Sequence, residues 1–270
     1  MPLTTIEDGE LYYEVHGTKG PWLVFVSGLG GHGDFWKAQV AHFSERYRVV
    51  IHDHRGYGRS TTVSPRGSIE QLTADVVRML DVLSADNIVL AGHSMGGMIA
   101  QNFALEHRDR LKSLVISGSA PKANEFGKLV LGFRRRILEA LGPEDYCRLQ
   151  TIISVGTAGA SMPFAEIMAS ERRSLDGLPQ AELVVSRLNS IAKFDRLGVL
   201  PKLSIPTLIM AAQDDNQAPV GASQLLADAI PGAKLRVLEG GGHFFPRTLP
   251  ARYNAALDEF LAGLHIGSDA

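Results

Sequence analysis

The sequence predicts an α/β protein with a mostly parallel central sheet flanked by helices and an inserted helical cap. Short apolar runs rich in β-branched residues alternate with segments whose apolar residues recur at helical spacing. The short runs are apolar throughout, which is typical of parallel strands buried on both faces. Between residues 120 and 200 this rhythm changes, because helical segments follow one another without a convincing strand.

The expected strands are apolar runs bounded by Gly, Asp or Asn. They are Leu11–Val15, Trp22–Val26, Arg48–Ile51, Ile88–Leu90, Leu114–Ile116, Thr207–Met210 and Leu235–Leu238. Helices are expected over Phe35–Phe43 and Ser68–Leu83, where apolar residues fall on one side of a helix. The result is a β-then-α pattern on both sides of the long helical segment.

We expect residues 1–119 and 201–270 to form the core, and residues 120–200 to form the cap. The expected cap helices are Phe126–Leu141, Pro143–Ile153, Pro163–Arg173 and Leu178–Ala192. An insertion between two strands would lie over the strand ends where ligands enter open α/β sheets. The alternative is a helical elaboration that only adds core.

Composition narrows the possible partners. The 270-residue chain is 45% hydrophobic and carries 27 basic and 29 acidic side chains, a net charge of −2. This balance argues against binding to nucleic acid or an anionic membrane, and favours a small-molecule substrate. One cysteine, Cys147, excludes an internal disulfide. With no secretory signal and no apolar run of about 20 residues, a cytoplasmic protein is expected. Whether it is a monomer or a homo-oligomer stays open.

The segment Gly92-His93-Ser94-Met95-Gly96 directly follows an expected buried strand and opens an apolar helical segment. A G-x-S-x-G in this context is typical of a nucleophile elbow, which holds its serine on a sharp turn at the strand end. The two glycines leave room where side chains would collide. Ser94 is therefore the candidate nucleophile.

A serine hydroxyl needs a base within hydrogen-bond reach and a carboxylate to orient that base. Two acids, Asp214 and Asp215, follow the expected strand Thr207–Met210. A glycine run, Gly240-Gly241-Gly242, follows Leu235–Leu238 and presents His243. The chain order is thus Ser, Asp, His.

These motifs, in this order, resemble the α/β-hydrolase superfamily over nearly the whole chain. The resemblance implies that His243 is the base, ahead of His32, His54, His93 and the other histidines. It favours Asp215 over Asp214, because Pro219 stands four residues after Asp215, where the family usually has a proline. His54 belongs to a segment, residues 53–60, that resembles a turn-organising loop of the family.

The loop Ser27-Gly28-Leu29-Gly30-Gly31 resembles those of 3-oxoadipate enol-lactonases and aminoacrylate hydrolases. Family register implies that the backbone N–H groups of Leu29 and Met95 form the oxyanion hole. Losing one such donor raises the barrier by about 2.7–4 kcal/mol. The resemblance implies no cofactor and no metal. The expected activity is serine hydrolysis of a small carboxylic ester or lactone through an acyl-enzyme.

Three alternatives stay open: a C–N hydrolase of a small amide or aminoacrylate-type substrate, a cofactor-free perhydrolase, and a ligand receptor on the same fold. Trp36 and Phe244 are the expected pocket residues, with ordinary core packing as the alternative. Arginines cluster at residues 134–136 and 172–173, where a substrate carboxylate would find donors. Solvated helix faces are the favoured interpretation of these clusters, so the sequence alone does not indicate an acidic substrate.

Overall fold

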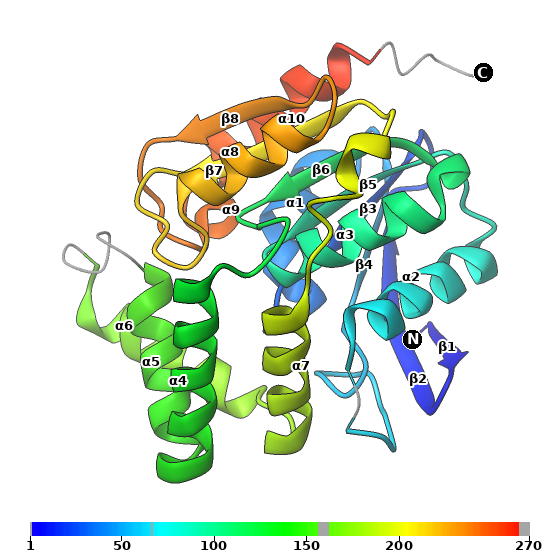
Figure 1. The fold of residues 1–270 in the computed structure, drawn as a ribbon. Helices are drawn as coiled ribbons and strands as arrows, with labels where there is room; N and C mark the ends of the chain where they lie inside the picture. The colour runs from blue at the N-terminus through cyan, green and yellow to red at the C-terminus, as the bar shows by residue number, and fades with distance from the viewer. Residues whose placement is uncertain (1, 66, 156–161, 265–270) are drawn as a thin grey trace.

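A computed structural model of the chain describes residues 2–65, 67–155 and 162–264. Within these residues the strands form one eight-stranded sheet in the order β1-β2-β4-β3-β5-β6-β7-β8 (Figure 1). The strands are β1 Leu3–Ile6, β2 Gly9–His16, β3 Trp22–Val26, β4 Arg48–His52, β5 Ile88–His93, β6 Leu111–Ser117, β7 Thr207–Ala212 and β8 Lys234–Leu238. From β4 to β8 neighbouring strands are parallel, whereas β1 and β2 pair antiparallel at one edge.

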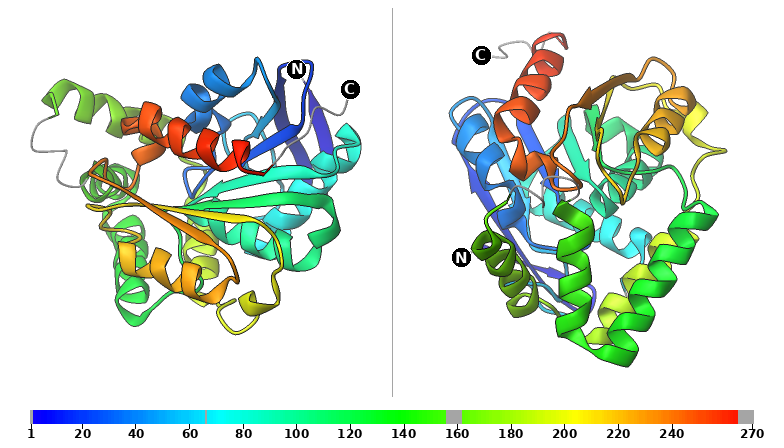
Figure 2. Two further views of the ribbon diagram at one scale, coloured as in Figure 1. Left: turned by 90° about the horizontal axis from the view of Figure 1, so that it is seen from above. Right: turned by 90° about the vertical axis from the view of Figure 1, so that its left-hand side faces the viewer.

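Helices cover both faces of the sheet, as the two views of Figure 2 show. One face is covered by α2 Ile69–Leu83, α3 Met95–Glu106 and α8 Val220–Ala229, and the other by α1 Lys37–Phe43 and α10 Pro250–Ala262. Along β3, Val24 and Val26 pack on the first face, while Leu23 and Phe25 pack on the second. A strand buried on both faces has no polar alternation, which explains its continuous apolar sequence. The predicted fold class is confirmed.

Two details differ from the prediction. The strand β1 was not expected; it pairs with β2 through a tight turn in which Asp8 has φ 67°. Such a four-residue edge strand carries too little periodic signal to be recognised in a sequence. The expected helix over residues 35–43 is divided into a 3-10 helix, Gly33–Trp36, and the α-helix α1. None of the described helices has the length and apolarity needed to cross a membrane.

A set of helices follows β6 and precedes β7 in the chain. These helices lie at one end of the sheet (Figure 1). The set comprises α4 Glu125–Leu141, α5 Pro143–Val155, α6 Phe164–Asp176 and α7 Ala181–Lys193. These helices share a small apolar cluster of their own, which includes Leu131, Tyr146 and Leu188. Helical periodicity in the sequence therefore located the helices correctly, with boundaries shifted by a few residues.

The set is anchored to the sheet through α7. Arg187 on α7 is fully buried, donates from Nη2 to the carbonyl oxygen of Arg55 at 2.6 Å, and stacks over the Tyr57 ring. Arg55 in turn forms a buried ion pair with Asp75 on α2, with Nε 2.7 Å from Oδ2. Charged groups that are buried and paired in this way fix the direction of their side chains. The helix α7 is thereby held against the loop after β4.

Buried histidines give the fold a predictable pH dependence. His52 on β4 is 1% exposed, and neither ring nitrogen has a partner among the described residues. Burial lowers the pKa of His52 to about 4. An unfolded histidine takes up a proton below about pH 6.5, so folding stability should decline as the pH falls from about 6.5 towards 4.

Lowering the pH from 7 to 5 should therefore reduce the unfolding free energy of the unmodified protein. In His52→Phe, which lacks the buried imidazole, this reduction should be smaller by about 2 kcal/mol. Urea unfolding of both proteins at the two pH values measures this difference. An equal loss in both proteins would show that His52 is not held neutral by the fold.

Candidate functional site

Ser94 occupies the turn between β5 and α3 with φ 57° and ψ −120°. This backbone conformation is strained for a residue other than glycine. The turn is closely packed, because a Cβ on Gly92 would lie 2.1 Å from the carbonyl oxygen of Gly96. A Cβ on Gly96 would lie 2.2 Å from the carbonyl oxygen of Val26. The Ser94 amide donates to the Ser117 carbonyl at 2.8 Å, which ties the strained turn to β6.

His243 and Asp215 lie beside Ser94, although they are more than 100 residues away in the chain. His243 Nε2 is 2.9 Å from Ser94 Oγ, and His243 Nδ1 is 2.8 Å from Asp215 Oδ2. Both the histidine and the aspartate are almost completely buried. The structure thus brings together the three residues that the sequence singled out, in a Ser–His–Asp chain of hydrogen bonds.

The surroundings of Asp215 favour its ionised form. Its Oδ1 accepts the backbone N–H groups of Gln217 and Ala218 at 2.8 and 2.9 Å. Burial alone would raise the pKa of Asp215, but the nearby His243 and these amides hold the pKa of this carboxyl below its ordinary value. An ionised carboxylate accepts a hydrogen bond from the Nδ1–H of His243. In that tautomer Nε2 carries no hydrogen, so it is the acceptor that faces Ser94.

The neighbouring Asp214 has a different partner. Its Oδ1 accepts the N–H of Gly242 at 2.8 Å, a bond that holds the loop that carries the histidine. In that loop Gly240, Gly241 and Gly242 all have positive φ, a conformation that L side chains rarely adopt. The conformation of the loop that positions His243 therefore requires these three glycines.

The same loop is also held by the helices inserted after β6. The His243 amide donates to the carbonyl oxygen of Ser154 on α5 at 3.0 Å. Ser154 Oγ accepts from Nε2 of Gln217 at 2.8 Å. Sequence reasoning did not identify Ser154 or Gln217, because their contribution depends on how α5 packs against the two loops. No motif in the sequence marks them.

The loop after β3 lies directly against Ser94. A Cβ on Gly28 would sit 3.0 Å from the Ser94 Cβ. The backbone amides of Leu29 and Met95 have no acceptor among the described residues, and both residues line the cavity at Ser94. His54 supports this loop, because its Nε2 is 2.9 Å from the Ser27 carbonyl oxygen. The contact agrees with the expected turn-organising role of the segment around His54, because it connects that segment to the loop after β3.

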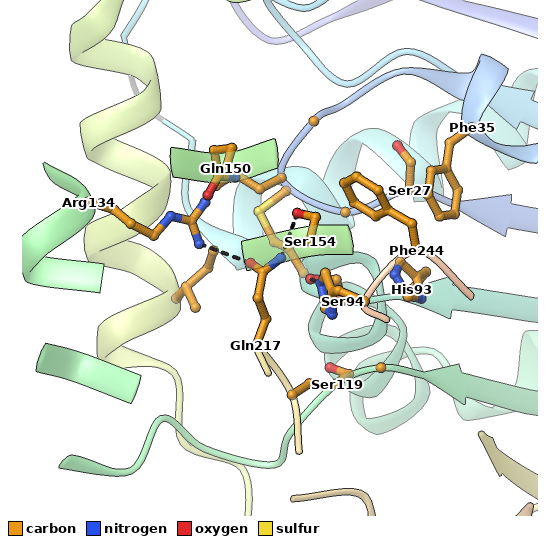
Figure 3. Close-up of a pocket in the computed structure, with 18 of the residues that line it drawn as sticks. Ser27, Phe35, His93, Ser94, Ser119, Arg134, Gln150, Ser154, Gln217 and Phe244 are labelled. Atoms are coloured by element: carbon orange, nitrogen blue, oxygen red, sulfur yellow. Dashed lines mark hydrogen bonds between the residues drawn. The ribbon is translucent and has the colours of Figure 1, made fainter. Parts of the chain in front are cut away.

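A cavity of about 530 Å³ opens onto Ser94 (Figure 3). His243 also lines it. Its walls come from the loops of the sheet and from α4, α5 and α6. Phe244 lines it as expected, but Trp36 does not: Trp36 is fully buried in the core and stacks on Phe25. Phe35 faces the cavity instead. Consecutive side chains of the 3-10 helix Gly33–Trp36 point about 120° apart, so Phe35 and Trp36 cannot both face the cavity.

His93 inside the elbow is buried and paired with Ser117, whose Oγ is 3.1 Å from Nδ1. Burial lowers the pKa of His93 to about 3, so its ring is neutral and packs against Phe35 and His243. Among the described residues no group of three or more His, Cys, Asp or Glu side chains is placed to hold a metal ion.

The chain was compared with protein families and with individual proteins. The sequence model of the family described as alpha/beta hydrolase fold matches residues 21–246. The chain is 33% identical over 258 residues to a protein of Azorhizobium caulinodans named "Putative carbamate hydrolase RutD", covering 95% of this chain and 97% of that relative.

Two solved structures are also similar. One is a thermophilic esterase from Thermogutta terrifontis, with a TM-score of 0.86 and 26% identity over 98% of this chain and all of the esterase. The other is the enol-lactonase from Burkholderia xenovorans, with a TM-score of 0.85 and 25% identity over 97% of this chain and all of the enol-lactonase.

Proposed function

Because the chain belongs to the alpha/beta hydrolase fold family, we propose that it is a serine hydrolase with Ser94, His243 and Asp215 as its catalytic triad. The observation that carries this proposal is the 2.9 Å separation between Ser94 Oγ and His243 Nε2, with Asp215 on the opposite ring nitrogen. A base oriented by a carboxylate at hydrogen-bond distance from a hydroxyl is the arrangement that activates a serine.

The proposed reaction begins when His243 Nε2 takes the proton of Ser94 and Oγ attacks the substrate carbonyl carbon. The amides of Leu29 and Met95 then donate to the developing oxyanion. His243 gives its proton to the leaving group, which departs and leaves an acyl group on Ser94. A water, deprotonated by His243, attacks the acyl carbon, releases the carboxylic acid and restores the Ser94 hydroxyl. Asp215 keeps the ring oriented and stabilises its cationic form throughout.

We assign residues 120–200 as a cap that shapes the substrate pocket. Side chains of α4, α5 and α6 line the cavity together with the loops of the sheet. The contact between Ser154 on α5 and the His243 amide supports the assignment, because it connects the cap to the catalytic loop. Selectivity for substrate is expected to depend on these helices, since the triad alone does not choose among acyl groups.

A small carboxylic ester or lactone is the substrate class that the solved neighbours favour, because an esterase and an enol-lactonase share the fold over nearly the whole chain. A second candidate is a carbamate or a small amide, favoured by the relative named as a carbamate hydrolase. Both classes use the same acyl transfer at Ser94 and differ in the leaving group.

A substrate panel separates these two classes. Purified protein should be assayed with short-chain esters, lactones, enol-lactones, carbamates and small amides, with Ser94→Ala as the blank for each compound. We expect Ser94-dependent turnover of esters or lactones at a kcat/KM above that for the nitrogen compounds. A higher kcat/KM for carbamates or amides would move the assignment to the second class. An absence of Ser94-dependent turnover across the panel would contradict a hydrolase.

A further inference from the structure

Arg134 on α4 is buried without a negatively charged partner. It is 6% exposed, its Nε has no acceptor, and it forms no ion pair with any described residue. Its two long contacts, both 3.4 Å, are with the neutral Oε1 of Gln217 and the neutral hydroxyl of Tyr146, and its guanidinium carbon lies 5.9 Å from the centre of the Tyr146 ring. These distances are well beyond the usual length of about 2.9 Å for an N–H···O bond. A buried cation with only such long contacts is energetically unfavourable.

The other buried arginines of the described residues each have at least one acceptor at a short distance. The equally buried Arg55 is paired with Asp75. Buried Arg187 also lacks a carboxylate, and its Nε and Nη1 have no partner among the described residues, but its Nη2 donates to a carbonyl at 2.6 Å and its guanidinium lies over the Tyr57 ring. Arg135, one residue after Arg134, is exposed and pairs with Glu139 on the same helix. Arg134 differs from both buried arginines because its two acceptors lie no closer than 3.4 Å.

Arg134 lies in the wall of the cavity that contains Ser94. Figure 3 shows its guanidinium directed toward Gln217, on the side of the cavity away from Phe35 and His93. Gln217 connects this side to the catalytic residues, since its backbone N–H donates to Asp215 at 2.8 Å. A ligand group bound to Arg134 would therefore lie in the same cavity as the Ser94 hydroxyl.

Most of the charged side chains that line the cavity are cationic. Lys37, Lys122, Arg173 and Arg247 also line it. Asp34 is the acidic residue among the described lining residues, and it is paired with Lys37 at 2.8 Å. A cavity lined by cations attracts anions and raises their local concentration.

We propose that Arg134 is a specificity-determining residue that binds a carboxylate of the substrate, remote from the bond that is cleaved. The substrate class is then an ester or lactone whose acyl part carries a second, ionised carboxyl group. The planar guanidinium, with its free Nε–H, offers the two parallel donors that a carboxylate accepts. This inference rests on the proposed function of Ser94 and names the substrate that the same site selects.

The test compares two 4-nitrophenyl esters of similar length, the glutarate monoester, which is anionic, and the neutral pentanoate. Arg134→Gln should lower kcat/KM for the glutarate monoester by about 30-fold or more, mainly through KM, and change the pentanoate value by less than about threefold. Arg134→Lys should recover part of the preference. Arg135→Gln is the matched control and should leave both values unchanged.

Equal losses of kcat/KM on the two esters in Arg134→Gln, or no loss on the anionic ester, would overturn this inference. The proposed function would still stand if pentanoate turnover depended on Ser94. Free glutarate gives a readout that does not need turnover. It should raise the Tm of the unmodified protein and of Ser94→Ala, but not that of Arg134→Gln. An identical Tm increase in Arg134→Gln would also overturn the assignment.

Discussion

Replacing Ser94 with alanine is expected to reduce hydrolysis of 4-nitrophenyl butyrate by about 10⁴-fold or more, and His243→Ala is expected to have an effect of similar size. Ser94→Ala removes the nucleophile. His243→Ala leaves the hydroxyl without the base that lies 2.9 Å from it. Because the two residues act as one unit, the double variant should be little worse than either single variant. Release of nitrophenol, with single-turnover kinetics for the slow variants, measures these losses.

Ser119→Ala is the matched control for this experiment. Ser119 lines the same cavity, and its buried Oγ has no hydrogen-bond partner among the described residues. Its loss should leave turnover within a few-fold of the unmodified protein. Circular dichroism of each variant should be unchanged, since the elbow is held by backbone bonds and close glycine contacts. Retention of unmodified turnover by Ser94→Ala or His243→Ala would contradict the proposed triad.

The second large effect is expected at the two neighbouring acids. Asp215→Asn should lower kcat by about 10³-fold to 10⁴-fold, because an amide no longer stabilises the protonated ring and favours the wrong tautomer of His243. Asp214→Asn should cost less than about tenfold. Its carbonyl oxygen still accepts the Gly242 N–H that the carboxylate accepts at 2.8 Å.

Parallel kcat measurements on the two variants decide between the acids. A larger loss for Asp214→Asn than for Asp215→Asn would move the acid of the triad by one residue. The Tm of both variants should be recorded with the kinetics, because both carboxylates also accept backbone amides. A loss of kcat in Asp215→Asn that disappeared after correction for unfolded protein would contradict a catalytic role.

The sequence predicted the sheet and the elbow because both depend on local patterns. Strands buried on two faces appear as continuous apolar runs, and the turn at Ser94 needs glycines at fixed offsets. The loop of His243 was recognisable for the same reason, since consecutive positive φ angles require glycine. Short or partly exposed elements such as β1 leave a weaker pattern, and that strand was missed.

Features that depend on packing between distant segments could not be predicted. Residues 134–136 are three successive arginines, and the sequence does not show which of them faces inward. The way α4 packs buries Arg134 and leaves Arg135 exposed. Trp36 was expected in the pocket, but it is buried in the core, and its neighbour Phe35 lines the cavity. The contact from Ser154 to His243 likewise exists only once α5 is in place.

The central claim is that Ser94 carries the acyl group during turnover, and covalent labelling tests it most directly. The protein should be treated with a fluorophosphonate, which forms a stable bond to an activated serine, and the adduct located by mass spectrometry of peptides. We expect one adduct per chain, on Ser94, in the unmodified protein and in Ser119→Ala, and none in Ser94→Ala. An adduct on another residue, or equal labelling of Ser94→Ala, would contradict the account.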